Sequence, residues 1–331
     1  MQPCRPITKE NLPLIIHNYK FIKYISKGGF SEIFLIENLK HGMLFAAKVM
    51  TFSAETVENK WKSFNSEISS LKRLNYPHII RFYDHFQYGL QLVLILEYCD
   101  GGTLQEEIDK HGALSDDRFA EVGYQLLETV RFCHEKKVAH RDIKASNILF
   151  DSYGRLKLAD FGLSLTMQMD KKEKTFAGSL LYSPPEIVQR RTYDPIKSDI
   201  WSIGVVLYQM SHGCYPWRFN SVEELNAKIV AVDYKMKTEI RNDIALLIHR
   251  SLLFNPEERF SLIDMLRAPM FLFRKSQPLG LKKTQSGYDE STFRKSEDES
   301  QSRQLYCTST VPLILRRSQV KTRVHRTNSM N

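Results

Sequence analysis

Four polar side chains that lie close together in the sequence could carry out phosphoryl transfer. Asp142 offers a carboxylate and Lys144 an amine, and the amide of Asn147 follows them. A second carboxylate, Asp160, comes after an apolar run, where no packing requirement explains it. Phosphoryl transfer needs an acceptor to be positioned, a metal ion to be held and developing negative charge to be neutralised. These four residue types provide a group for each task.

Two short apolar runs, 147–150 and 155–158, must position these side chains, and both are typical of β-strands. A turn at Gly154 would join the two strands into a hairpin. Asp142 comes before the first strand, and Asp160 leaves the second. The sequence therefore predicts that the carboxylates, the amine and the amide meet at the open end of one hairpin.

The letters of this stretch, HRDIKASN followed by DFG, resemble the catalytic loop and the D-F-G motif of protein kinases. A D-F-G triplet alone would carry little weight, whereas both motifs at hairpin spacing form a specific pattern. The resemblance implies that Asp142 positions a substrate hydroxyl and accepts its proton, with Lys144 beside it. It also implies that Asn147 and Asp160 hold Mg²⁺ against the phosphates of ATP. Lys144 is the residue that serine/threonine-specific members of the family carry at this position.

The resemblance covers residues 19–273 and implies the α+β, two-lobed protein-kinase fold. The expected N-lobe, residues 19–98, is rich in strands and holds one helix. The expected C-lobe, residues 99–273, is mostly helical. Residues 1–18 contain three prolines and no clear periodicity, so we expect an extended N-terminal leader there.

A turn between two β-rich runs is the expected phosphate-binding loop. The pattern Ser26-x-Gly28-x-x-Ser31-x-Ile33 resembles the kinase glycine-rich loop, but serine replaces its first and last glycines. Small residues still let backbone amides approach phosphates, although some backbone freedom is lost. Without the other motifs, an ordinary hairpin tip would be the better interpretation.

The apolar run at residues 91–96 predicts a buried strand that leads into Glu97 and Cys99. This stretch resembles the hinge between the two lobes of a kinase, although an ordinary strand-to-helix turn is the alternative. The resemblance implies that backbone groups of residues 97–99 bind adenine and that Leu96 lies at the back of the pocket. The residues that it places around the nucleotide are Ser26, Lys27, Gly28, Gly29, Phe30, Ser31, Ile33, Ala46, Lys48, Leu96, Glu97, Cys99 and Leu149.

Lys48 lies between apolar residues on an expected central strand. A lysine inside a strand is costly to bury without a partner, so an edge position open to solvent is one interpretation. Glu67 is a candidate partner on the following helix, where it would otherwise be an exposed charge. Together the two resemble the Lys–Glu pair of kinases, which directs the amine to the phosphates of the nucleotide.

The polar stretch from Leu163 to Ser183 resembles an activation segment, and Thr175 within it resembles a regulatory phosphorylation site. A phosphate would add about −1.5 to −2 charges, with which Arg141 could pair beside the catalytic base. An unmodified loop residue is the alternative. Ser179 is a nearby hydroxyl, which we expect to contact the catalytic loop instead.

Three residues are expected to have structural roles in the C-lobe. Glu186 and Arg259 resemble the ion pair that ties the activation segment to this lobe, whereas Arg259 without a partner would be a surface charge. Asp199 comes at the start of an apolar run and resembles the anchor of the catalytic-loop backbone. A simple helix N-cap is an equally physical interpretation of Asp199.

The composition of the chain is ordinary for a soluble globular protein, with 42% hydrophobic and 26% charged residues among 331. Its five cysteines are scattered and show no C-x-x-C spacing, which argues against a zinc site or a disulfide framework. This pattern favours a reducing compartment. No signal peptide or membrane-spanning run is recognisable. We therefore expect a cytoplasmic protein, with the nucleus as the alternative.

Most of the net charge of +9 belongs to the C-terminal tail. Residues 274–331 hold 12 Lys and Arg against 5 Asp and Glu, a surplus of +7 that leaves +2 for residues 1–273. Few large apolar residues occur in this tail, so disorder is expected. Residues 311–317, VPLILRR, could dock a partner, a calmodulin-type protein or an acidic membrane surface, although a solvated basic tail is the plainer interpretation.

These observations favour an ATP- and Mg²⁺-dependent serine/threonine protein kinase that acts on protein substrates, with no direct binding of nucleic acid expected. A pseudokinase scaffold is the alternative. Such proteins typically lose the equivalents of Lys48, Asp142, Asn147 or Asp160, and all four are present here. Nothing in the sequence indicates an oligomeric state.

Two finer features concern kinase group and substrate. The stretch 255–259, NPEER, is among those that look most like the calcium/calmodulin-dependent and AMP-activated group. Thr103 and Ser146 occupy positions at which some members select basic substrates with acidic side chains. A strong preference for arginine three residues upstream of the acceptor is therefore not implied.

Overall fold

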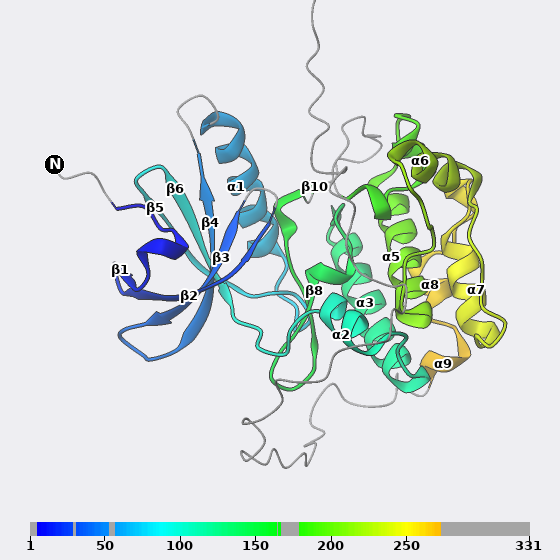
Figure 1. Ribbon diagram of the computed structural model, residues 1–331, viewed down its shortest axis with the longest axis horizontal. Helices are drawn as coiled ribbons and strands as arrows, with labels where there is room; N and C mark the ends of the chain where they lie inside the picture. Colours follow the sequence, from blue (N-terminus) through cyan, green and yellow to red (C-terminus); the bar gives the residue numbers. More distant parts are fainter. Residues whose placement is uncertain (1–4, 29–30, 53–56, 164, 167–178, 273–331) are drawn as a thin grey trace, which may run out of the picture.

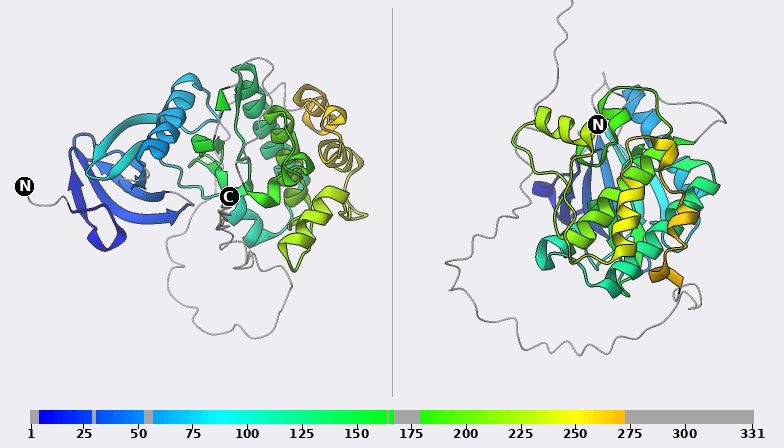
Figure 2. Two further views of the ribbon diagram at one scale, coloured as in Figure 1. Left: turned by 90° about the horizontal axis from the view of Figure 1, so that it is seen from above. Right: turned by 90° about the vertical axis from the view of Figure 1, so that its right-hand side faces the viewer.

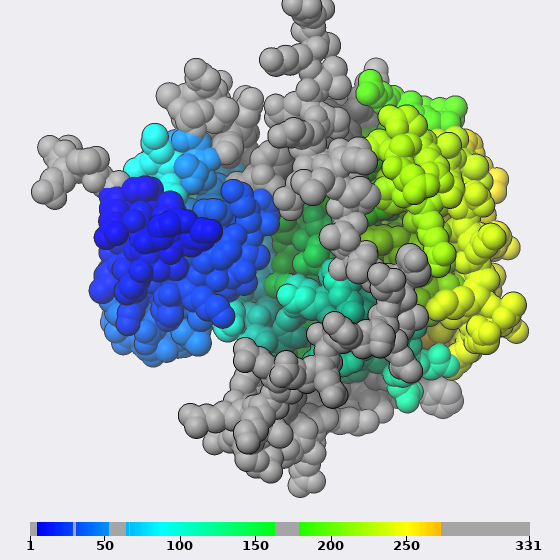
Figure 3. All heavy atoms as spheres, viewed as in Figure 1, coloured from blue at the N-terminus to red at the C-terminus, as the bar shows by residue number. Residues whose placement is uncertain are grey.

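The structure, a computed structural model, describes residues 5–28, 31–52, 57–163, 165–166 and 179–272. They form a β-rich N-lobe and a larger helical C-lobe (Figure 1). Seen from above, the blue strands lie at one end and the green to gold helices at the other (Figure 2). In the space-filling view the blue N-lobe lies on the left and the green to yellow C-lobe on the right (Figure 3). This arrangement confirms the α+β, two-lobed fold expected from the sequence.

The N-lobe is built on an antiparallel, six-stranded sheet with the strand order β1-β2-β3-β4-β6-β5. One face of this sheet packs on the only α-helix described in the lobe and continues into the main core. The opposite face carries a separate core that includes Phe21, Phe34 and Val93. The elements are β1 (Leu14–Ile16), β2 (Tyr19–Lys27), β3 (Glu32–Asn38), β4 (Leu44–Thr51), α1 (Val57–Arg73), β5 (Phe82–Tyr88) and β6 (Gln91–Glu97).

Residues 14–16 form strand β1 of this sheet and Ile7 packs in its separate core, so the expectation of an extended leader is wrong for the described part of residues 1–18. Strand β1 pairs with β2, and Ile7 is fully buried in the separate core. The Ile7 amide donates to Gln91 Oε1 at 2.7 Å, and Gln91 Nε2 donates to the Ile7 carbonyl at 3.0 Å. The apolar side chains of this segment cover a sheet face that would otherwise be exposed to water.

The C-lobe is organised around α5, whose residues are buried almost throughout. This helix begins at Pro195, and the carboxylate of Asp194 accepts the Ile196 amide as the N-cap. Asp199 therefore lies inside the helix, and the interpretation of Asp199 as an N-cap is wrong. The helices are α2 (Leu104–His111), α3 (Asp116–Glu135), α4 (Pro185–Val188), α5 (Pro195–His212), α6 (Val222–Ala231), α7 (Asn242–Ser251), α8 (Leu262–Met265) and α9 (Pro269–Leu272).

Two short antiparallel ladders lie between the sheet of the N-lobe and the helices of the C-lobe (Figure 1). Strands β8 (Ile148–Phe150) and β9 (Leu156–Leu158) form the predicted hairpin, in which Ile148 pairs with Leu158. Strands β7 (Val138–Ala139) and β10 (Leu165–Thr166) form the other ladder. Among the described residues, no helix combines the length and the apolarity needed to span a membrane.

Candidate active site

Asp199, which has no exposed surface, fixes the backbone at the start of the catalytic loop. Its two carboxylate oxygens accept the backbone amides of His140 at 2.9 Å and Arg141 at 2.8 Å. The ring of His134, near the end of α3, lies 2.8 Å from the same carboxylate. Arg141 has a positive φ of 68°, a left-handed conformation that is unfavourable for a residue with a side chain. The hydrogen bonds that Asp199 accepts from these amides stabilise this conformation, so the predicted role of Asp199 as a backbone anchor is confirmed.

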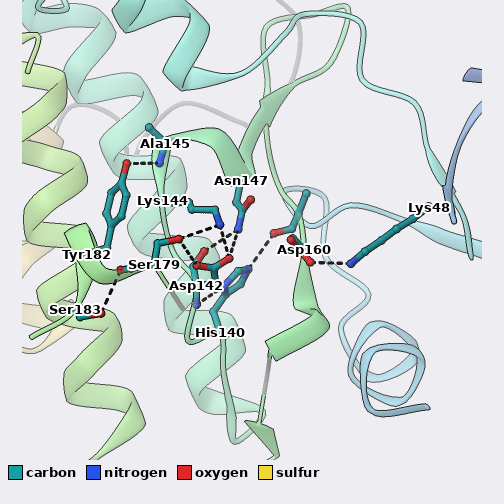
Figure 4. A network of polar contacts seen from close by, with 11 residues as sticks. Lys48, His140, Asp142, Lys144, Ala145, Asn147, Asp160, Ser179, Tyr182 and Ser183 are labelled. Atoms are coloured by element: carbon teal, nitrogen blue, oxygen red, sulfur yellow. Dashed lines mark hydrogen bonds and ion pairs between the residues drawn. The ribbon is translucent and has the colours of Figure 1, made fainter. Parts of the chain in front are cut away.

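Asp142, buried at 7% exposure, is the centre of the polar network in Figure 4. Lys144 Nζ lies 2.6 Å from Asp142 Oδ2, and the Ser179 hydroxyl donates to Asp142 Oδ1 at 3.2 Å. Asn147 Nδ2 donates to the Asp142 carbonyl at 2.8 Å and to Oδ2 at 3.1 Å. The predicted group at the mouth of the hairpin is therefore present, and Ser179 does contact the catalytic loop. A carboxylate fixed in this way can orient a hydroxyl and accept its proton.

The residues expected to hold magnesium fit that ion. The nitrogen of the Asn147 amide is used by Asp142, which leaves its oxygen as a ligand. Asp160 uses Oδ1 to contact Lys48, and its side chain keeps 44% of its surface exposed, so a metal ion can reach this carboxylate. Partial desolvation alone would raise the pKa of the Asp160 carboxyl. The nearby charge of Lys48 outweighs this effect and lowers the pKa of Asp160 to about 2, so Asp160 stays charged. Oxygen ligands of this kind suit Mg²⁺, which would neutralise charge on the phosphates when bound.

Lys48 is at the centre of a second network, on β4. Its amine lies 2.7 Å from Glu67 Oε1 and 2.7 Å from Asp160 Oδ1. Burial alone would lower the pKa of Lys48, but the charges of Glu67 and Asp160 outweigh it and raise this pKa above the usual value. The Lys48 and Glu67 side chains are only 9% and 2% exposed, so the interpretations as an edge-strand lysine and an exposed helix charge are both wrong.

One face of the sheet carries the apolar residues expected around the nucleotide. Ile33 on β3 is directly opposite Lys48 on β4, and Ala46 is opposite Leu96 on β6. Residues directly opposite one another point to the same face, and so do residues two apart on one strand. Ile33, Ala46, Lys48 and Leu96 therefore share a single face. Leu149 lies on β8 in the C-lobe and is partly buried.

The expected phosphate-binding turn is partly described. The Gly28 amide donates to the Ser31 carbonyl at 2.8 Å, and Gly29 and Phe30 lie outside the described residues. A Cβ on Gly28 would lie 3.4 Å from Ser31 Oγ, an ordinary contact, and Gly28 has no left-handed φ. The fold itself therefore does not require glycine here. Close approach of a ligand to the backbone is the physical reason that remains for it.

The hinge shows one departure from expectation. The Glu97 amide donates to the Arg81 carbonyl at 2.8 Å, so this donor of the 97–99 group is used within the protein. The Glu97 side chain contacts Lys157 Nζ at 2.7 Å. Lys157, on β9, was not predicted as a site residue. The argument that identified Lys48, a lysine inside an apolar strand that needs a partner, applies to it equally.

Glu186 and Arg259 form the ion pair that was expected to tie the activation segment to the C-lobe. Arg259 contacts Glu186 through two hydrogen bonds of 2.8 Å, and its side chain is fully buried. This confirms the predicted pair and excludes Arg259 as a surface charge.

Thr175 lies outside the described residues, and Arg141 Nη2 donates to the Tyr193 hydroxyl at 3.0 Å. The proposed phosphate contact between Thr175 and Arg141 therefore stays a prediction.

His134 is the other residue that the sequence did not identify. It occupies the polar end of a helix whose apolar face was predicted correctly, and nothing local distinguishes it from a solvated histidine. Only the packing of α3 against α5 brings its ring to Asp199.

Comparison with known proteins agrees with this geometry. A family model described as "Protein kinase domain" matches residues 19–271. Aurora kinase C of Mus musculus is 31% identical over 264 residues, which cover 80% of this chain and 95% of that kinase. A Mus musculus protein with the provisional name sperm motility kinase W is 32% identical over 251 residues, 76% of this chain and 50% of that protein. The chain belongs to the protein kinase family.

Proposed function

We propose that this protein is an active serine/threonine kinase that transfers the γ-phosphate of Mg-ATP to protein hydroxyls. The contact of 2.6 Å between Lys144 Nζ and Asp142 Oδ2 is the observation that carries the proposal. It places a cation beside the proposed proton acceptor, where negative charge develops on the transferred group. A lysine at this position is also the feature that the serine/threonine-specific members share.

The network of Lys48, Glu67 and Asp160 supports turnover rather than nucleotide binding alone. Lys48 contacts Glu67 and Asp160 at the same time, so the groups expected to hold the phosphates and the metal already lie together. The alternative of a scaffold without turnover is supported only by the serines at positions 26 and 31.

The proposed substrate class is one without a required upstream arginine. Thr103 has no charge, and its hydroxyl accepts the Glu106 amide at 3.1 Å as the cap of α2. Ser146 is exposed and also uncharged. Neither residue offers the carboxylate that a guanidinium group would need. The assignment to the calcium/calmodulin-dependent and AMP-activated group is a separate prediction, since neither relative's name refers to that group.

Phosphorylation of a peptide library by the purified full chain tests these proposals. The library should contain serine, threonine and tyrosine acceptors, with every residue varied at the position three before the acceptor. We expect Mg²⁺-dependent transfer to serine and threonine without enrichment of arginine. Transfer to tyrosine would contradict the proposed specificity. Binding of Mg-ATP with no transfer to any acceptor would favour the scaffold.

A further inference from the structure

The C-lobe contains a large apolar groove that the proposed kinase activity does not use. It is lined by the end of α6, the segment between α6 and α7, α7 itself and the segment after α7. Helix α7 lies at the end of the C-lobe farthest from the sheet (Figure 1). The groove has a volume of about 710 Å³, which is within the ~300–1,000 Å³ typical of ligand sites. Its lining includes Val232, Tyr234, Met236, Leu252, Leu253 and Phe254.

The groove is pre-formed, because hydrogen bonds to α5 fix the segment between α6 and α7. The Tyr208 hydroxyl donates to the Lys235 carbonyl at 2.7 Å. The Lys237 amide donates to His212 Nε2 at 3.2 Å, and Lys237 Nζ donates to the His212 carbonyl at 3.0 Å. Binding to a fixed wall costs little reordering of the protein. Phe254 nevertheless leaves 45% of its surface exposed at this groove.

The chain itself supplies an apolar segment of matching chemistry. The described part of the chain ends at Leu272 in α9, and 59 residues follow in the sequence. Residues 311–315, VPLIL, form the most apolar cluster in that polar and basic stretch. Arg316 and Arg317 follow directly, and Asp233 is an exposed carboxylate in the segment that borders the groove. The cluster therefore matches the apolar lining; Lys235 and Lys237 lie in the same segment as Asp233, so the match rests on apolar contact and not on charge.

We propose that the VPLIL segment, residues 311–315, docks in the groove between α6 and α7 of the same molecule. The 38 residues between Leu272 and Val311 have a typical end-to-end distance of about 35 Å if flexible. A domain of this size has a radius of gyration of about 18 Å, so the whole C-lobe is within reach. A tether of this length gives an effective concentration that can approach the millimolar range. An affinity of ~0.1 mM then suffices to keep about nine molecules in ten docked.

Limited trypsin digestion of the full chain tests the docking, because cleavage sites lie beside and away from the segment. Arg316 and Arg317 adjoin the VPLIL segment, whereas Lys282 and Lys283 are distant sites in the same tail. We expect cleavage at the Arg316–Arg317 site to be about tenfold slower than at the Lys282–Lys283 site. Equal rates at the two sites in the unaltered protein would overturn the proposal.

Matched variants identify the groove as the docking site. Phe254→Asp changes the groove, and Leu246→Asp is its control, since Leu246 is 49% exposed on α7 but does not line the groove. Ile314→Asp changes the tail segment, and Val320→Asp is the corresponding control. Protection should be lost in Phe254→Asp and Ile314→Asp and kept in both controls. Met236→Glu is a second groove variant, for use if Phe254→Asp lowers the unfolding midpoint.

Two further outcomes would contradict the proposal. Protection that persists in both groove variants would place the segment elsewhere on the protein. Protection that weakens on dilution of the protein would mean that the segment binds a second copy rather than its own C-lobe.

Discussion

The Asp199 carboxylate accepts the backbone amide of Arg141 at 2.8 Å, although 58 positions separate the two residues in the sequence. Asp199→Ala would leave this amide, the His140 amide and the His134 ring without their acceptor. Each buried donor without an acceptor costs about 1–3 kcal/mol, so we expect the free energy of unfolding to fall by at least ~2 kcal/mol. Urea unfolding measures the loss. Asp194→Ala is the control, because loss of that N-cap costs only about 1 kcal/mol. Equal destabilisation by both variants would contradict the anchoring role.

Asp142→Asn should lower turnover by about 10²–10⁴, the usual contribution of a positioned acid–base group. Asn147 and Asp160, which are expected to face the metal and the nucleotide, are unchanged in this variant. The affinity for Mg-ATP should therefore stay close to that of the unaltered protein. Steady-state phosphorylation and equilibrium nucleotide binding separate the two effects. A parallel loss of binding would show that Asp142 mainly holds the loop together.

Asp160→Asn should weaken nucleotide binding only when magnesium is present. The variant removes a negative charge from the expected metal ligand and from the contact with Lys48. ATP affinity should be measured with Mg²⁺ and with EDTA. The ratio of these two affinities should be closer to one in the variant than in the unaltered protein. An unchanged ratio would mean that Asp160 is not a metal ligand.

Ser31→Gly should tighten ATP binding by about threefold to tenfold, which corresponds to ~0.7–1.4 kcal/mol. The Ser31 carbonyl already accepts the Gly28 amide, and removal of the side chain would let the backbone approach the phosphates more closely. Ser26→Gly should have a smaller effect, because Ser26 is paired with Ile33 in the sheet, where glycine is unfavourable. Weaker binding by Ser31→Gly would indicate that the hydroxyl itself contacts the nucleotide.

Phosphorylation at Thr175 should raise activity by about tenfold or more. One or two charge-assisted hydrogen bonds, of ~1.5–3 kcal/mol each, exceed the 1.36 kcal/mol that a tenfold change in rate requires. The phosphorylated protein, the phosphatase-treated protein and Thr175→Ala should be compared in one assay. If all three had the same activity, the regulatory role of Thr175 would be excluded.

The sequence predicted the site well where motif spacing determines the contact. The Lys48–Glu67 and Glu186–Arg259 pairs were expected from the resemblance of their motifs to those of protein kinases, and both form. Contacts that depend on the packing of distant elements were missed. Residues 5–18 show no periodicity, and Ile7 is bound by Gln91, 84 positions later. No local pattern encodes such a contact, so a packed segment was taken for a leader.

The contact between Ile7 and Gln91 also constrains the order of folding during synthesis. Ile7 leaves the ribosome first, but its hydrogen-bonding partner is made 84 residues later. Strand β6, which begins at Gln91, also lies between β4 and β5 and joins β5 to the sheet. Until that strand emerges, the apolar face covered by the N-terminal segment has no complete sheet on which to pack. The N-lobe sheet should therefore be completed only after β6 has emerged, and a nascent chain that stops before Gln91 should expose this face to chaperones.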